Sequence, residues 1–236
     1  MASLIDALCI KAQDPPALAR FWAGVLGREV DASGTALPPE ADTALRLRFV
    51  PTGEPKVHRS RMHVDLTSAT LEEQQATVAR ALALGGRHFD VGQLPEEEHV
   101  VLADPEGNEF CVIEPGNNFL DGCGVIGAVS SDGSQRVGYF WSEALGWPLV
   151  WDQDEETAIQ SARGGTKISW GGPPFEPKHG PNRWFYDLVP GPGDDHATEL
   201  ERLIGLGATR AQGVAGDGAV ALLDPDDNEF RLLAAP

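Results

Sequence analysis

The sequence DPEGNEF at residues 104–110 returns as DPDDNEF at residues 224–230, which is 120 positions later. Two other motifs recur at nearly the same distance: FW at 21–22 returns at 140–141, and EPK at 54–56 returns at 176–178. Separated motifs that repeat at a nearly constant distance indicate a duplicated unit. The sequence therefore predicts two copies of one domain, residues 1–115 and 123–236, joined by a segment rich in turn formers.

The first half of each copy is predicted to contain a strand, a helix and further strands. Residues 4–12 are apolar enough for a strand, and Asp14 followed by Pro15 marks the start of a helix. Apolar side chains then recur at helical spacing as far as Gly27, a residue that suits the end of a helix. Residues 45–49 alternate between apolar and polar side chains, as half-buried strands do.

The second half of each copy repeats this order. Residues 62–66 alternate like a strand, and Thr70 with Glu73 forms a capping box for a second helix. Two more strands are expected on either side of the DPEGN turn. In copy two the second helix is expected around residues 197–206. Each copy is thus predicted to be an α+β domain.

With these motifs the chain resembles the glyoxalase/bleomycin-resistance/dioxygenase, or vicinal oxygen chelate, proteins, and among them the glyoxalase-like ones. The resemblance rests on EPK at 54–56, RMHVDL at 61–66 and DPEGNEFCV at 104–112. It implies two tandem domains, each of paired βαβββ modules, whose sheets curl around a cleft with helices outside. It also implies a pseudo-symmetric domain pair in one chain, acting as a monomer or within a homodimer.

Alternation along the strands assigns side chains to the two faces of each sheet. Met62, Val64 and Leu66 are apolar and belong under the helices, so His63 and Asp65 are expected in a cleft. The same reasoning gives the other inward positions: Ala7, Cys9, Glu109, Cys111 and Ile113 in copy one, and Ile126, Ala128, Phe185, Asp187, Glu229 and Arg231 in copy two.

Each copy is expected to have its own cleft. In copy one, Cys9, Glu109 and Cys111 are expected to converge with His63 and Asp65. In copy two, Trp170 either forms a flat apolar wall with Phe185, as small-molecule pockets often have, or packs in the core. The candidate ligand-binding residues are therefore Cys9, Glu109, Cys111, Trp170, Phe185, Asp187, Glu229 and Arg231.

His63 and Asp65 are the candidate catalytic residues, because they lie two positions apart on one face of a strand. A cleft histidine beside a carboxylate can serve as a general base. The alternative is a structural polar network, since copy two keeps Asp187 but has Phe185 in place of the histidine.

The resemblance implies a metal in some members, held by a His on the first strand, a His on the fifth and a Glu on the eighth. Here these positions hold Ala7, His63 and Cys111, and copy two offers Ile126, Phe185 and Arg231. We therefore expect no metal and no other cofactor. The alternative is an atypical site in which His63 and Cys111 are joined by Cys9 or Glu109.

Three functions follow from these expectations. The first is a metal-free protein that binds a small organic molecule in a cleft, like the drug-sequestering members of the family. The second is a lyase, isomerase or dioxygenase-like enzyme that uses His63 as a base or as an atypical metal ligand. The third is a non-catalytic interaction module with vestigial clefts.

The composition excludes several classes of partner. A net charge of −18, from 36 acidic and 18 basic residues, disfavours binding to nucleic acid or to anionic membranes. The chain has no apolar run of membrane length, and its first residues lack a signal-peptide pattern, so a cytoplasmic location is expected. Cys9, Cys111 and Cys123 show no zinc-type spacing and are expected to be free thiols.

Four basic residues stand out in this acidic chain. Lys56 and Arg61 in copy one are matched by Lys178 and Arg183 in copy two. They are expected either to bind an anionic ligand or to pair with nearby acids at the surface. The histidines other than His63 are expected to be solvated surface residues.

Overall fold

The computed structural model describes residues 2–94, 96–211 and 218–234, so the outer ends of the predicted copies, Met1 and Pro236, lie outside the described residues. The chain begins with strand β1 (Leu4–Ala12) and helix α1 (Pro15–Leu26). The Asp14 carboxylate accepts a hydrogen bond from the Ala17 amide at the start of α1, and Gly27 ends the helix with φ 67°. Glycine suits that position because it has no Cβ to clash in the left-handed conformation.

The capping box of helix α2 (Leu71–Ala83) forms with a small change in register. The Thr70 hydroxyl accepts from the Glu73 amide at 3.2 Å, as the sequence predicts. The Glu73 carboxylate reaches back to the amide of Ala69, at 2.8 Å, and not to that of Thr70.

The remaining elements follow the predicted order in both copies. Copy one continues with β2 (Ala36–Leu37), β3 (Leu47–Pro51), β4 (Met62–Leu66), β5 (Arg87–His88), β6 (Val100–Ala103) and β7 (Glu109–Val112). The short 3-10 helix η1 (Asn118–Leu120) lies in the segment that joins the copies. Copy two contains β8 (Ile126–Ser131), α3 (Gln135–Leu145), β9 (Leu149–Gln153), β10 (Glu156–Ile159), β11 (Lys167–Trp170), β12 (Trp184–Val189), α4 (His196–Leu206), β13 (Thr209–Arg210), β14 (Val220–Leu223) and β15 (Glu229–Leu232).

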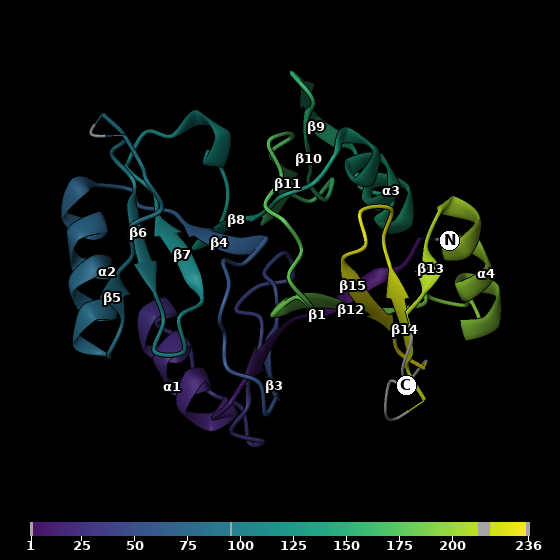
Figure 1. Ribbon diagram of the computed structural model, residues 1–236, viewed down its shortest axis with the longest axis horizontal. Helices are drawn as coiled ribbons and strands as arrows, with labels where there is room; N and C mark the ends of the chain where they lie inside the picture. The colour runs from purple at the N-terminus through teal and green to yellow at the C-terminus, as the bar shows by residue number, and fades with distance from the viewer. Residues whose placement is uncertain (1, 95, 212–217, 235–236) are drawn as a thin grey trace.

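Each sheet is built from one half of each copy. Sheet A has the order β13-β14-β15-β12-β1-β3-β2, and sheet B has the order β5-β6-β7-β4-β8-β11-β10-β9. The halves join through antiparallel pairs, β1 with β12 and β4 with β8. In Figure 1 both sheets run from the lobe with α1 and α2 to the lobe with α3 and α4. The copies are therefore joined by backbone hydrogen bonds across the middle of both sheets.

The repeated FW and DPxxN motifs contact one another in the core. Trp22 is fully buried, and its indole N–H donates to the Asp104 carboxylate at 3.2 Å. Trp141, 3% exposed, donates in the same way to Asp224 at 3.1 Å. A buried indole needs such a partner. The two motifs thus recur together because the carboxylate of one accepts the hydrogen bond that the buried indole of the other must donate.

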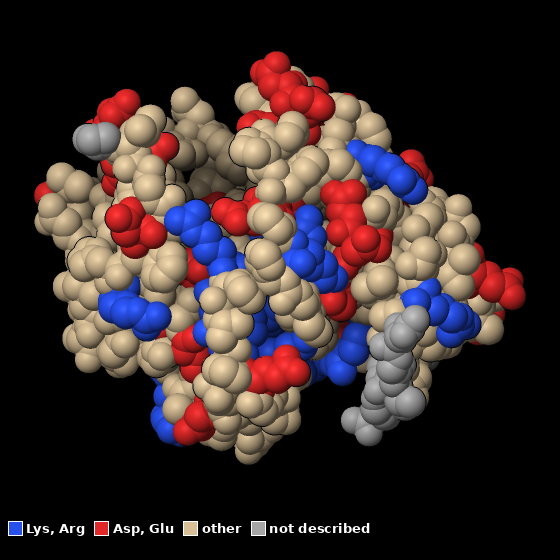
Figure 2. Space-filling view, in the orientation of Figure 1, with Lys and Arg blue, Asp and Glu red and all other residues tan. Residues whose placement is uncertain are grey.

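Charge is unevenly spread over the surface. Figure 2 shows Lys and Arg side chains gathered around the middle of one face, between the lobes, while Asp and Glu lie around much of its periphery. In the described part of the chain, no helix is long and apolar enough to cross a membrane.

Candidate functional site

One row of side chains crosses five strands of sheet B on the face turned away from the helices. His63 on β4 lies opposite Ser130 on β8, and Ser130 lies opposite Ser169 on β11. The row continues to Ala158 on β10 and to Trp151 on β9. These residues line a pocket of about 410 Å³, which is the size of a small-molecule site.

His63 and Asp65 form the polar centre of this face, as alternation predicts. His63 Nε2 lies 3.3 Å from Asp65 Oδ1, and the Ser130 hydroxyl donates to Asp65 Oδ2 at 2.5 Å. Ser130 and Ser169 share a hydrogen bond of 3.1 Å. The His63 side chain is 35% exposed at the pocket and that of Asp65 only 12%. The imidazole is thus the part of the pair that a bound molecule can touch.

The pair is held in its charged form. Burial lowers the pKa of His63, but the charge and hydrogen bond of Asp65 outweigh it and hold that pKa well above 6.5. Burial raises the pKa of Asp65, but the charge and hydrogen bonds of His63 and the bond from Ser130 hold it below its usual value. Burial raises the pKa of the neighbouring Cys111 thiol. At neutral pH this group is an imidazolium, a carboxylate and a thiol.

These shifts predict a pH-dependent contribution to stability. Because the folded pKa of His63 is raised, its contribution is fully present below the unfolded value of about 6.5 and is lost as pH rises through the folded pKa. The wild type should exceed His63→Gln by up to about 1 kcal/mol at pH 5.5, since partial exposure screens the pair. The difference should shrink at pH 9 in urea denaturation, whereas the exposed His88→Gln gives no such trend. A difference that is constant with pH would contradict the ion pair.

In sheet A, the position equivalent to the His63–Asp65 pair holds a network of arginines around Asp187. Asp187 is fully buried and accepts from Arg48 Nη1 at 2.6 Å, from Arg231 Nε at 2.6 Å and from Arg231 Nη2 at 2.7 Å. The Cys9 thiol donates to the same carboxylate at 3.1 Å. Phe185, 5% exposed, takes the position of His63 and lies 5.0 Å from the Arg231 guanidinium. The polar groups here saturate one another, as in a structural network.

The expected convergence in copy one is wrong for Cys9. β1 belongs to sheet A and β4 to sheet B, so Cys9 lies with Asp187 and not with His63. Trp170 and Phe185 do not share a wall for the same reason. Trp170 is 2% exposed and belongs to the core cluster, although it contributes to the pocket lining.

The inward position on β8 is also displaced from the prediction. Ala128 lies opposite Asp65, as Ala7 lies opposite Asp187, so Ala128 and not Ile126 is the equivalent of Ala7. Ile126 is 2% exposed and packs in the core. The error arises because Ala128 lies 12 positions before Phe140, whereas Ala7 lies 14 positions before Phe21, so the spacing of the FW motif misaligns the two first strands.

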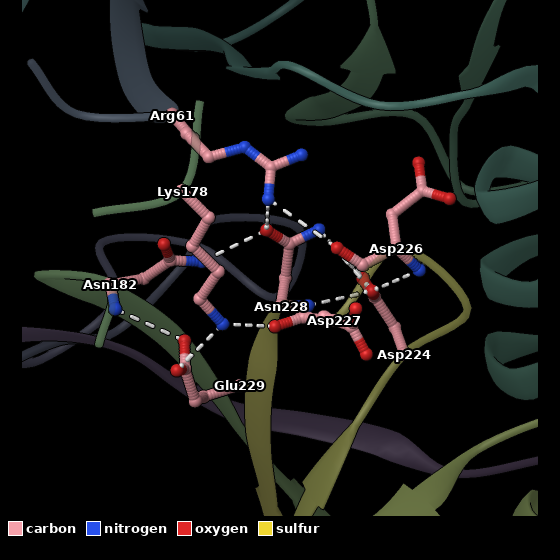
Figure 3. A network of polar contacts seen from close by, with 8 residues as sticks. All are labelled: Arg61, Lys178, Asn182, Asp224, Asp226, Asp227, Asn228 and Glu229. Carbon is pink, nitrogen blue, oxygen red and sulfur yellow. Dashed lines mark hydrogen bonds and ion pairs between the residues drawn. The ribbon is translucent and has the colours of Figure 1, made fainter. Parts of the chain in front are cut away.

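The carboxylates of Glu109 and Glu229 each accept hydrogen bonds from residues of their own copy. Glu109 accepts from Lys56 Nζ at 2.7 Å and from the Ser60 amide at 3.3 Å. Figure 3 shows Glu229 held in the same way, by Lys178 Nζ at 2.8 Å and the Asn182 amide at 3.1 Å. The repeated EPK and NEF motifs therefore fasten the loop that connects the two halves of each copy.

One arginine in each copy donates a hydrogen bond to the other copy. Arg61 donates to the Asn228 side chain at 3.0 Å, in the turn of copy two (Figure 3). Arg183 donates to Glu106 at 2.8 Å, in the turn of copy one. This reciprocal bonding explains why Arg61 and Arg183 recur. Arg183 has the acidic partner that one of the two expectations gives it, whereas Arg61 bonds to an amide oxygen and a backbone carbonyl.

Three side chains in sheet B offer a potential metal site. The ligand atoms of His63, Asp65 and Cys111 all lie within 4.8 Å of one another, next to the pocket. Three protein ligands and an open position are what a catalytic zinc site has. This set differs from the expected alternative, because Asp65 takes part and neither Cys9 nor Glu109 does.

Sequence reasoning missed several residues of both groups. Ser130, Ser169 and Trp151 line the sheet B pocket, and Arg48 completes the sheet A network. Ser130 follows Ala128 by two positions on β8, so alternation pointed to its face. The contact of Ser130 with Asp65 depends on pairing between copies, which one strand does not reveal.

The sequence and the fold are similar to those of known glyoxalase-like proteins. A family model described as a glyoxalase-like domain matches residues 7–113 and again residues 128–233. The structure is similar to glyoxalase I from Zea mays, with 14% identity and a TM-score of 0.65 over 99% of this chain and 92% of that one. It is also similar to a putative dioxygenase from Bacillus subtilis subsp. subtilis str. 168, with 13% identity and a TM-score of 0.64 over 98% and 85%. At such identities the likeness shows the fold alone. No curated protein matches this sequence.

Proposed function

The chain belongs to the glyoxalase-like domain family and contains two copies of the domain. We propose that it binds a small, neutral organic molecule in the sheet B pocket without the usual metal triad. The observation that carries the proposal is the His63–Asp65 pair at the edge of a pocket of about 410 Å³. A protonated imidazole that is partly exposed offers a hydrogen-bond donor to an oxygen of the bound molecule.

The charges around the pocket support a neutral ligand. His63 is balanced by Asp65, and the lining also contains the carboxyl groups of Asp132 and Glu156. An anion would meet this acidic lining, so a carbonyl or hydroxyl group fits better than a carboxylate. The apolar part of the ligand would lie against Phe119 and Trp151, which line the same pocket.

The same geometry favours a donor role for His63 over that of a general base. With its pKa held above 6.5 by Asp65, the imidazole carries its proton near neutral pH. If the protein turns over its ligand, His63 would stabilise or protonate an oxygen, and Asp65 would orient the ring.

Filling the pocket tests the proposal. Ser169 lies in the middle of the row, so Ser169→Phe places a ring in the space that the ligand would occupy. Binding of hits from a neutral fragment library, read by saturation-transfer NMR, should be lost in this variant. Ala162→Phe, which adds the same ring to an exposed turn, should bind like the wild type. Hits that bind Ser169→Phe unchanged would place the site elsewhere.

A second candidate is metal-dependent chemistry in the same pocket, favoured by the clustering of His63, Asp65 and Cys111. The nitrogen, oxygen and sulfur donors fit a borderline metal such as zinc. Such an ion would polarise an oxygen of the ligand. Zinc retained by the wild type and by Cys123→Ser, but not by Cys111→Ser, would favour this candidate over metal-free binding.

A further inference from the structure

A second, smaller cavity lies where loop 52–61 of copy one meets loop 177–183 of copy two. Its volume is about 110 Å³, room for a few water-sized groups, since water takes up about 30 Å³ in the liquid. Among the described residues that line it, Glu54 is the one with a carboxylate. Six of the chain's 18 lysines and arginines line it: Lys11, Lys56, Arg59, Arg61, Lys178 and Arg183.

Most of these cations have a partner, but Lys11 does not have an acidic one. Lys56 and Lys178 pair with Glu109 and Glu229. Within the described residues, no carboxylate lies at ion-pair distance from the Lys11 ammonium, which instead lies 5.9 Å from the ring of Phe185. Burial is the main cause that holds the pKa of Lys11 below its usual value: the charges of Glu229 and Glu54 oppose it, and those of Arg183 and Lys178 add to it.

Three of the lining residues also carry a donor atom that is buried and has no partner in the described part of the chain. These donors are the Ser60 hydroxyl and the Nε–H groups of Arg61 and Arg183. A buried donor without an acceptor destabilises the folded protein. In Figure 3 the bonds of Arg61 to the turn of copy two use one end of its guanidinium and leave Nε unbonded.

Two histidines lie at the same place. His58 and His179 are exposed, as the sequence predicts, but their rings stack on one another with centroids 4.4 Å apart. Both line the cavity, so they bring further N–H donors to it from the two copies.

We propose that this cavity binds a small tetrahedral oxyanion, such as phosphate or the phosphoryl group of a monoester, between Lys11 and the unpartnered donors of Ser60, Arg61 and Arg183. The four oxygens of such an ion accept several hydrogen bonds at once, and its charge neutralises the ammonium. A neutral molecule would leave the Lys11 ammonium without an anionic partner at ion-pair distance. The residues come from both copies, so the ion would also hold the two connecting loops together.

Phosphate binding, measured by isothermal titration calorimetry in a chloride buffer of constant ionic strength, tests the proposal. Lys11→Met should weaken binding at least tenfold, and Ser60→Ala, which removes one unpartnered hydroxyl, several-fold. Arg163→Met, which removes the same charge from an exposed turn, should leave it unchanged. His63→Ala should also leave it unchanged, because His63 lies in the other pocket.

A parallel titration with glycerol phosphate distinguishes the source of the group. Binding of both compounds with the same loss in Lys11→Met indicates a monoester ligand, and binding of phosphate alone indicates the free ion. No saturable binding by the wild type, or equal binding by wild type and Lys11→Met as for an adventitious ion, would overturn the proposal.

Discussion

Replacing Asp187 by alanine is expected to lower the free energy of unfolding by about 3 kcal/mol. The carboxylate is fully buried and holds the guanidinium groups of Arg48 and Arg231 at 2.6–2.7 Å. Without it the two cations face each other, and among the described residues Arg48 keeps one side-chain partner, Asp6 at 2.5 Å. The two arginine side chains are 28–29% exposed, so water can solvate part of their charge. The expected loss of stability therefore lies at the lower end of the range for broken buried ion pairs. Urea denaturation at neutral pH measures it.

Asp65→Ala is the matched control, because Asp65 occupies the same place in sheet B. Its partners are the half-exposed His63 and the Ser130 hydroxyl, so its removal should cost about 1 kcal/mol. Equal losses at the two positions would show that the arginine network contributes no more to stability than the His63 pair does.

Local structure could be predicted because its causes are local in sequence. The Asp14–Pro15 start and Gly27 end of α1 depend on groups within one helical turn of each other. The alternation in residues 62–66 is enough to place Met62, Val64 and Leu66 in the core. The repeated motifs likewise predicted two copies with the same order of elements.

The pairing of the halves could not be predicted in this way. Each half of a copy offers a free strand edge, and the side-chain pattern of one strand does not say which other edge will pair with it. The structure pairs β1 with β12 and β4 with β8. Every error in the predicted clefts, including the placement of Cys9 and of Trp170, depends on this choice or on the register of β8.

The part of the site that lies on a single strand could be predicted from the sequence. His63 and Asp65 follow from alternation on β4 alone. Ser130 and Ser169 come from copy two. Ser130 meets Asp65 only through the pairing of β4 with β8, and Ser169 bonds to Ser130, so their role was not visible. Arg48 was missed in the same way, because its partner Asp187 is 139 residues away in the chain.

Replacing His63 by alanine is expected to weaken ligand binding in the sheet B pocket by about 10- to 100-fold. A hydrogen bond from a charged donor is worth about 1.5–3 kcal/mol, and each 1.4 kcal/mol changes affinity about tenfold. The fold should be kept, because the imidazole is 35% exposed and its loss leaves Asp65 bonded to Ser130. Affinities for a hit from the fragment library, measured by calorimetry, give the ratio directly.

His88→Ala is the control for this change, because His88 is exposed on β5 and does not line the pocket. Asp65→Asn gives an independent reading, since it removes the charge that holds the pKa of His63 above 6.5. In that variant the imidazole should lose its proton nearer to neutral pH, and affinity should fall between pH 6 and 8, where the wild type changes little. Equal losses in His63→Ala and His88→Ala would show that the ligand does not bind at the His63 face of sheet B.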